Sequence, residues 1–202
     1  DGDRLAMVDH CGEVVDGDEV LFIIAKAWHE KGKLKSKTVV GTKMTNLGAR
    51  QAFAKLNIKF IEADVGDRYV MEEIKSNKAA LGGEGSGHII CLNKSTSGDG
   101  IISALQVLEA ICKTGKTLHE LKSEMKKYPQ ALINVKTNGK LDLDNHSGLN
   151  KAIKAVNSGL GKNGRVIIRP SGTEPLVRVM VECNDLELAN KSAKQLAKAL
   201  KS

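Results

Sequence analysis

The sequence predicts a mixed, mainly parallel α/β domain followed by a small α+β domain. Residues up to about 127 alternate short apolar, β-branched runs with stretches of helical periodicity, which is the order of right-handed βαβ units. After Tyr128 and Pro129 the pattern changes to apolar runs that end in one amphipathic helix. We therefore expect two domains that meet near Tyr128.

The elements of the first part follow from apolar spacing and from capping residues. Apolar side chains recur at helical spacing from Val20 to Ala27, after Asp16 or Asp18 as the cap of the amide end. Thr117 and Glu120 have the spacing of a capping box that opens a later helix. In chain order we expect strands over residues 5–8, 38–42, 60–65 and 88–92, and helices from 17, over 47–56, 68–75, 101–111 and from 117.

The second part has fewer elements. Two apolar runs at residues 166–169 and 176–181 flank a short link and predict a β-hairpin. A strand is expected over residues 132–135 and a helix over 149–156. The last helix has its apolar side chains on one face and lysines on the other, with inward positions at 188, 189, 193, 196, 197 and 200.

Composition excludes several classes of protein. Of the 202 residues, 41% are hydrophobic and 27% are charged, which is far from a disordered composition. The longest apolar run, residues 20–25, is much shorter than the roughly 20 residues of a membrane span, and no export signal is recognisable, so no membrane association is expected. Because basic residues are dispersed and aromatic residues make up 3%, nucleic-acid binding is not expected either. The net charge of +7 suits a solvated surface or small anionic substrates.

The cysteines and histidines show no metal-binding spacing. The four cysteines lie far apart without a C-x-x-C pair, which is typical of a reduced, cytoplasmic protein without disulfides or structural zinc. The five histidines offer no H-x-x-x-H spacing. A match to G-x-G-x-x-G at residues 159–164 follows a helix and precedes a strand, the reverse of the dinucleotide-binding order, and is read as a turn.

Two polar loops could bind a ligand. The glycine-rich residues 82–88 carry Glu84, Ser86 and His88, whose donors and acceptors suit sugar hydroxyls. An ordinary flexible turn before a strand explains the same residues equally well. Residues 169–175 present a guanidinium, two hydroxyls and several backbone N–H groups, a plausible anion cradle. A hairpin loop of turn formers is the alternative, but the emergence of Arg169 from an apolar strand favours the anion.

Two further features are weaker alone. Asp1 and Asp3 are spaced to hold a divalent cation, typically Mg²⁺, although two carboxylates at a chain start are often merely solvated. Lys43 and Asp67, with Arg68 next to it, follow predicted strands, where ligands of open α/β sheets gather. Asp67 equally fits a helix cap, and Lys43 a solvated side chain.

Together, these motifs resemble the α-D-phosphohexomutases, and within that family the phosphoglucosamine branch. Asp1 to Arg4 is similar to the end of the family's metal loop, residues 83–88 to its sugar-recognition loop, and residues 169–175 to its phosphate-binding loop. Residues 66–70 and 96–100 resemble segments typical of the phosphoglucosamine branch. The motifs run through the whole chain in family order.

The resemblance implies a division into domains. Residues 1–10 would end the family's second domain, 11–127 would form the third, sugar-recognition domain, and 128–202 the fourth, phosphate-binding domain. The first of the three aspartates of the metal loop has no counterpart, and neither has the domain with the phosphoserine. The chain is therefore expected to be a C-terminal portion, inactive alone, whose partners include the missing N-terminal domains. A homodimer stays open.

The resemblance also implies roles for individual residues. Asp1 and Asp3 would hold Mg²⁺, and Arg4 would contact the transferring phosphoryl group. Glu84, Ser86 and His88 would hold sugar hydroxyls. The non-reacting phosphate would be bound by the fourth-domain loop, through Arg169, Ser171, Gly172 and Thr173 with help from Arg178. Lys43, Asp67 and Arg68 are further candidates, and the general base is unassigned between Lys43 and Asp67.

The implied reaction is the reversible interconversion of glucosamine 6-phosphate and glucosamine 1-phosphate. A phosphoserine would phosphorylate the sugar, the bisphosphate would reorient, and the other phosphate would return to the serine. The alternatives are a phosphoglucomutase or phosphomannomutase of the same family, and a non-catalytic module that binds a phosphosugar or another anion through the Arg169 loop.

Overall fold

The computed structural model describes residues 1–137, 143, 145–171 and 174–201, and the chain divides into two compact units. The first unit spans Asp1–Lys127 and the second Tyr128–Ser202. Each unit has its own hydrophobic core and is described by itself. The α/β class expected from the sequence is confirmed.

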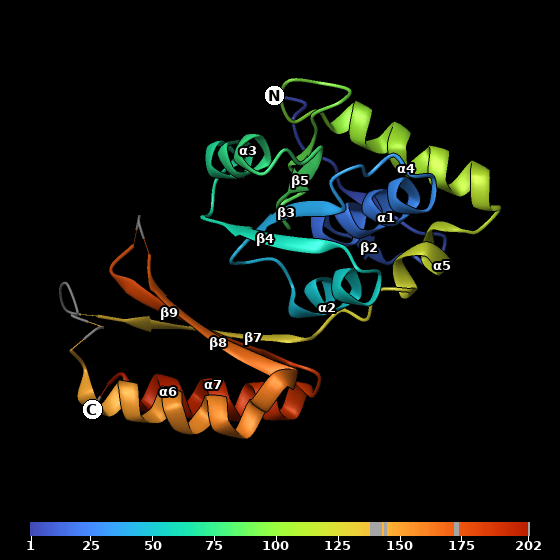
Figure 1. The fold of residues 1–202 in the computed structure, drawn as a ribbon. Coiled ribbons are helices and arrows are strands. Elements are labelled where there is room, and N and C mark those ends of the chain that lie inside the picture. Colours follow the sequence, from blue (N-terminus) through green and yellow to red (C-terminus); the bar gives the residue numbers. More distant parts are fainter. Residues whose placement is uncertain (138–142, 144, 172–173, 202) are drawn as a thin grey trace. The chain divides into compact units, whose positions relative to one another are not determined.

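The first unit is built on a four-stranded mixed sheet in the order β4-β3-β5-β6 (Figure 1). β3 (Thr38–Thr42) runs parallel to β4 (Lys59–Ala63) and to β5 (Leu81–Gly83), and β6 (Ile89–Cys91) runs antiparallel to β5. A separate antiparallel pair joins β1 (Met7–Val8) to β2 (Val14–Val15). The predicted strand over 5–8 is therefore shorter, and β5 was not predicted.

Helices cover both faces of the four-stranded sheet, because successive buried residues of each strand point to opposite sides. Val39 packs with α1 (Gly17–Glu30) and α2 (Leu47–Lys55), whereas Val40 packs with α3 (Asp67–Ser76). The helices α4 (Gly100–Thr114) and α5 (Leu118–Ser123) contribute to the Val39 side.

Side-chain caps explain where four of the first-unit helices, α1, α2, α4 and α5, begin. The Asp16 side chain accepts from the backbone N of Asp18 and Glu19 and starts α1, with Glu19 completing a capping box. Of the two predicted caps, Asp16 is thus the one used. Asp18 is buried and accepts from the backbone N of Asn46 at 2.9 Å, which ties α1 to the start of α2. The capping box of Thr117 and Glu120 is also present.

The second unit is a three-stranded antiparallel sheet with helices on one face (Figure 1). Its order is β7-β9-β8, with β7 at Gln130–Lys136, β8 at Gly164–Pro170 and β9 at Leu176–Cys183. The predicted hairpin is the β8–β9 pair. A core of apolar side chains joins the sheet to α6 (Ser147–Leu160) and α7 (Leu186–Ala199), and the 3₁₀ turn η1 (Gly161–Asn163) follows α6. None of the helices within the described ranges is long and apolar enough to cross a membrane.

Candidate functional site

A cavity of about 470 Å³ in the first unit collects residues that the sequence analysis had singled out separately. Its lining comes from the start of the chain, from the N-terminus of α3, from the glycine-rich loop and from the loop before α4. The lining residues are Asp1, Asp3, Asp67, Arg68, Met71, His88, Ile90, Thr96, Ser97 and Gly98. The expected metal loop and one expected sugar ligand, His88, therefore share one cavity.

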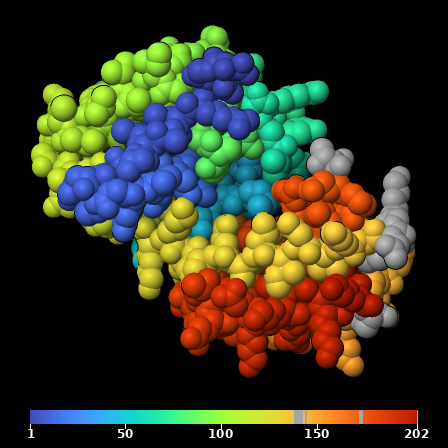
Figure 2. Space-filling view, turned by 180° about the vertical axis from the view of Figure 1, so that it is seen from behind, coloured from blue at the N-terminus to red at the C-terminus, as the bar shows by residue number. Residues whose placement is uncertain are grey.

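Backbone contacts fix the start of the chain against the glycine-rich loop. Arg4 and His88 form an isolated antiparallel bridge, and Leu5 N donates to Gly87 O at 3.0 Å. Gly87 has a φ of +92°, and a Cβ there would lie 2.2 Å from the Leu5 carbonyl oxygen, so the two segments approach this closely because residue 87 has no side chain. Figure 2 shows the first residues, in dark blue, lying against the green middle of the chain.

His88 is a buried polar side chain facing this cavity. The Nε2 atom lies 4.0 Å from Oδ2 of Asp3, and the side chain is 9% exposed. Within the described residues, Nδ1 of His88 is buried without a hydrogen-bond partner. A Cβ on Gly98 would lie 2.3 Å from Nε2, so the loop before α4 closes directly over the imidazole. A buried ring nitrogen without a partner is costly in an inert site and is better explained by a ligand-binding one.

The glycine-rich loop is held in one shape and is not a loose turn. Glu84 N donates to His88 O at 2.9 Å, and Gly87 N donates to Glu84 O at 3.0 Å. The Glu84 carboxylate accepts from Gly66 N at 3.0 Å and so joins this loop to the segment before α3. Neither Glu84 nor the exposed Ser86 lines the 470 Å³ cavity. These contacts show an ordered loop that places His88, but not Glu84 or Ser86, at the cavity.

The three weaker candidates lie in different places. Asp67 is the first residue of α3, and its carboxylate accepts from Arg68 N at 2.7 Å. The Arg68 side chain is 80% exposed and pairs with Glu72 at 2.8 Å. Lys43 lines a separate hollow of about 260 Å³ and pairs with Asp64 at 2.5 Å. The structure therefore does not bring Lys43 into the cavity that Asp67 and Arg68 line.

Asp1 and Asp3 supply the hard oxygen donors that Mg²⁺ prefers. Both line the cavity, and Oδ2 of Asp3 also lies 3.9 Å from Nε of Arg4. Within the described part of the chain they do not join a third histidine, cysteine or carboxylate in a ligand group. Mg²⁺ commonly keeps several waters and takes one or two carboxylates, so this donor set fits the ion.

In the second unit, Arg169 of β8 and Arg178 of β9 are directly opposite each other. Opposed residues of an antiparallel pair share a face, and this face is opposite to Val177 and Val179, which pack on the helices. Two like charges in such positions destabilise a sheet, and an anion bound between them would offset the repulsion. Nε of Arg178 is buried without a hydrogen-bond partner among the described residues, and its Nη2 lies 3.7 Å from Glu174.

The loop between these strands is partly described. Ser171 N donates to Leu176 O at 2.8 Å, and Oγ of Ser171 accepts from Glu174 N at 3.3 Å. The predicted ligands Gly172 and Thr173 lie outside the described residues. Sequence reasoning missed Asn134 of β7, which is opposite Arg178 on the other side. It noted residues 96–100 only as resembling a segment of the phosphoglucosamine branch and gave Thr96, Ser97 and Gly98 no role at the site.

Comparisons with known proteins match both units. The family model described as phosphoglucomutase/phosphomannomutase, alpha/beta/alpha domain III, matches residues 16–128, and the corresponding C-terminal domain model matches 132–199. A phosphoglucosamine mutase of Ruthia magnifica is 59% identical over 201 residues, which is 100% of this chain and 46% of the relative. One from Methylococcus capsulatus is 56% identical, covering 98% of this chain and 45% of the relative. The chain thus spans about half the length of these curated relatives.

Solved structures show the same fold. Aspergillus fumigatus N-acetylphosphoglucosamine mutase, in complex with GlcNAc-6P and magnesium, superposes with a TM-score of 0.78 at 23% identity. The match covers 98% of this chain and 50% of that one. A phosphomannomutase-like protein of Thermus thermophilus gives a TM-score of 0.71 at 21% identity and covers 99% of this chain and 44% of that one.

Proposed function

Because the chain belongs to the phosphoglucomutase/phosphomannomutase family, we propose that it is the sugar-recognising and phosphate-binding part of a phosphoglucosamine mutase. The observation that carries the proposal is the cavity in which Asp1, Asp3 and His88 meet. The choice of glucosamine phosphate is supported by the relatives named phosphoglucosamine mutase, which are 50–59% identical to this chain.

In the first unit, the chain positions the reacting end of the sugar phosphate. Asp1 and Asp3 would hold Mg²⁺, which when bound supplies charge neutralisation for phosphoryl transfer. Arg4 is fixed by its bridge to His88 and offers a guanidinium to the transferring group. His88 donates to or accepts from a sugar hydroxyl through its ring nitrogens, and Glu84 and Ser86 extend this recognition from the same loop.

In the second unit, Arg169 and Arg178 bind the phosphate that does not react. Their shared face concentrates two guanidinium groups, and guanidinium binds phosphate in a bidentate manner. Ser171, with Gly172 and Thr173, would add backbone and hydroxyl donors. Binding energy from this remote phosphate holds the reacting end of the sugar in the correct position, and this positioning lowers the activation barrier for phosphoryl transfer.

The remaining catalytic parts would belong to a longer protein. The relatives are about twice the length of this chain, and we assign the phosphoserine and the N-terminal domains to their additional residues. An exposed apolar stripe of α4 (Ile101, Leu105 and Leu108) supports a further protein contact on the first unit. The homodimer and the cytoplasmic location stay predictions, tested by light scattering and by fractionation of the longer protein.

The test uses the longer protein and three hexose 6-phosphates that differ only at C2 of the sugar. We expect Mg²⁺-dependent turnover of glucosamine 6-phosphate in preference to glucose and mannose 6-phosphates, abolished by a chelator. Preference for glucose or mannose would reassign the substrate within the family. No turnover of any hexose phosphate by the phosphorylated protein would overturn the mutase proposal and leave an anion-binding module.

A second test isolates the phosphate site in this chain. Arg169→Ala should weaken phosphosugar binding by about 1–3 kcal/mol, the range for a charge-assisted hydrogen bond, in a calorimetric titration. Lys191→Ala is the matched control, because it removes an exposed positive charge from α7, the helix that covers the other face of the sheet. Equal affinities of wild type and Arg169→Ala would remove Arg169 from the site.

A further inference from the structure

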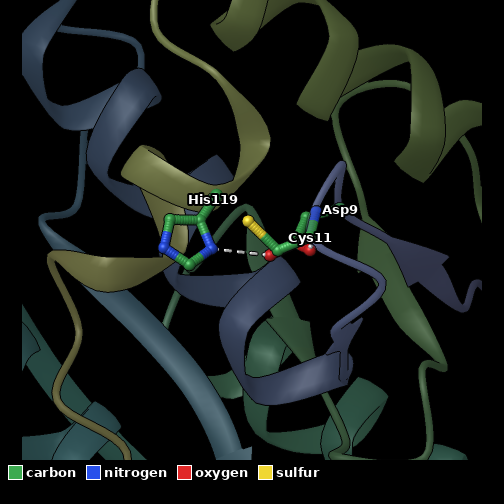
Figure 3. A group of neighbouring side chains, drawn as sticks. All are labelled: Asp9, Cys11 and His119. Carbon is green, nitrogen blue, oxygen red and sulfur yellow. Dashed lines mark hydrogen bonds and ion pairs between the residues drawn. The ribbon is translucent and has the colours of Figure 1, made fainter.

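Three side chains of metal-ligand type converge outside the site described above. Asp9 and Cys11 lie in the turn between β1 and β2, and His119 lies in α5. One ligand atom from each, a carboxylate oxygen, the sulfur and a ring nitrogen, lies within 4.8 Å of the other two. Figure 3 shows the three side chains turned toward one another. Because about 110 residues separate the turn from His119, no spacing motif in the sequence reveals this group.

The turn that carries Asp9 and Cys11 is fixed by its own hydrogen bonds. Oδ1 of the fully buried Asp9 side chain accepts from Cys11 N and from Glu13 N, both at 2.9 Å. Gly12 N donates to Asp9 O, and Asp9 N donates to Glu13 O, each at 3.0 Å. Oδ1 is thus occupied by the backbone, and Oδ2 is the oxygen that faces the other side chains. The ligands on this turn need little ordering when an ion arrives.

The charged groups of this cluster, the carboxylates of Asp9 and Glu13 and the ammonium of Lys122, together carry one net negative charge. Oδ2 of Asp9 lies 2.9 Å from Nδ1 of His119 and 2.8 Å from Nζ of Lys122. Lys122 also pairs with Glu13 at 2.7 Å, so one ammonium faces two carboxylates. Cys11 is exposed and His119 is 36% exposed, so an ion has access from solvent.

We propose that Asp9, Cys11 and His119 form a binding site for a divalent ion of the zinc class. The ligands are Oδ2 of Asp9, Sγ of Cys11 and Nδ1 of His119, with water in the fourth position. Zinc bonds of about 2.0 Å to O and N and about 2.3 Å to S place tetrahedral ligand atoms about 3.3–3.5 Å apart. Sγ of Cys11 therefore moves inward by about 1.3 Å at most from the 4.8 Å limit, and Oδ2 of Asp9 and Nδ1 of His119, now 2.9 Å apart, separate by about 0.4 Å. The thiol proton is released to solvent on binding, and the proton between Nδ1 of His119 and Oδ2 of Asp9 is exchanged through solvent to Nε2 of His119, so that Nδ1 offers a lone pair to the ion.

The donor set separates this site from the magnesium site. A thiolate and an imidazole favour zinc, cobalt or cadmium over Mg²⁺, which prefers oxygen ligands. Lys122 keeps Glu13 as its partner when Asp9 Oδ2 turns to the ion. The bound ion joins the β1–β2 turn to α5, two segments that are distant in sequence, so binding stabilises the first unit.

The experiment uses Co²⁺ as the spectroscopic probe on the reduced, metal-free 202-residue chain. We expect one equivalent of Co²⁺ to produce a sulfur-to-cobalt charge-transfer band that Zn²⁺ displaces and excess Mg²⁺ does not. Cys11→Ser should abolish the band, and His119→Ala should weaken Zn²⁺ binding at least tenfold. Cys112→Ser is the matched control, since Cys112 is the other exposed cysteine and should leave the band unchanged.

Two outcomes would overturn the proposal. One is the absence of a charge-transfer band in the wild-type chain, and the other is a band that survives Cys11→Ser but is lost in Cys112→Ser. Cys11 is exposed and its side chain makes no packing contribution to the core, so Cys11→Ser is expected to fold. Equal far-ultraviolet circular dichroism of the variants verifies this. Phosphosugar binding is measured in parallel, and the metal result stands whether or not the chain binds the sugar.

Discussion

Gly17, the first residue of α1, is the position where one methyl group tests how the sugar loop is held. Its N donates to Gly85 O at 3.1 Å. A Cβ on residue 17 would lie 2.0 Å from the Glu84 carbonyl oxygen and 2.5 Å from Gly87 N. Both obstacles are backbone atoms, so no side-chain rotation relieves the collision. Gly17→Ala therefore has to move the loop.

The size of the effect follows from these distances. To reach 3.0 Å, below which real Cβ contacts essentially do not occur, the Glu84 carbonyl must retreat by about 1 Å. Overpacking of this kind costs about 1–3 kcal/mol, and we expect about 3 kcal/mol because backbone obstructs the methyl group on two sides. A misplacement of about 1 Å costs about 100-fold in catalysis, so kcat/KM of the longer enzyme should fall by about that factor.

Two assays separate the loop effect from simple destabilisation. Urea unfolding is followed by the fluorescence of Trp28, the single tryptophan, which is buried in α1. Glucosamine 6-phosphate turnover is measured in the longer protein. Gly115→Ala is the matched control, because residue 115 caps α4 at a φ of +68° with open space around it. It should cost about 1–2 kcal/mol and leave kcat/KM unchanged.

Wild-type kcat/KM in Gly17→Ala would refute the idea that α1 fixes the sugar loop. An equal loss in Gly115→Ala would mean that lower stability alone explains the result. Loss in Gly17→Ala with retention in Gly115→Ala is the outcome that the contacts predict.

Gly98→Ala places a methyl group 2.3 Å from Nε2 of His88 and displaces the imidazole. We therefore expect weaker phosphosugar binding in a calorimetric titration, and an unchanged affinity would remove His88 from the site. The side chain of Glu182 is fully buried and forms an ion pair with Arg165, whose side chain is 17% exposed. Glu182→Ala should therefore cost about 3 kcal/mol in urea unfolding, the lower end for a broken buried pair. Hydrogen bonds keep the pKa of Asp9 below its usual value, so its contribution to stability is present above about pH 3.9 and is lost as pH falls further. Asp9→Asn should lower the melting temperature at pH 7 and make the melting temperature less dependent on pH below pH 4. A melting temperature that falls below pH 4 as steeply as in the wild type would contradict this.

Local signals predicted much of the fold. The Asp16 cap, the Thr117 capping box and the β8–β9 hairpin each depend on residues within a few positions of one another. Such interactions are visible in sequence because the chain itself holds the partners close. The ends of elements were less well predicted, as α6 runs from Ser147 to Leu160 where residues 149–156 were expected.

The missed strand β5 shows where local signals fail. Gly82 and Gly83 have low strand propensity and were read as part of a loop. In the structure Gly82 is opposite Val40 on one side and Ile90 on the other, and a Cβ there would lie 2.8 Å from Cδ1 of Ile74. The strand exists because α3 packs closely on it, which is a tertiary constraint that propensity does not contain.

The candidate site, like the fold, was predicted in its local features but not in its tertiary contacts. Residue types near Asp1, His88 and Arg169 predicted the chemistry, but not which of them meet. Asp3 reaches His88 because the chain start pairs with the glycine-rich loop across more than 80 residues. The predicted reason for the glycines, close approach to a ligand, is also incomplete, since Gly87 approaches the backbone of Leu5.

Glycine contacts therefore complement polar residues as evidence for how a site is built. A polar side chain indicates what a site can bind, whereas a glycine against backbone indicates which segments must stay in contact for the site to exist. Gly17 and Gly87 hold the sugar loop from two sides, one against α1 and one against the chain start. If the loop were only a flexible turn, alanine at either residue would be absorbed by local movement. A site of fixed shape requires both substitutions to reduce substrate binding, although neither residue can touch the sugar through a side chain.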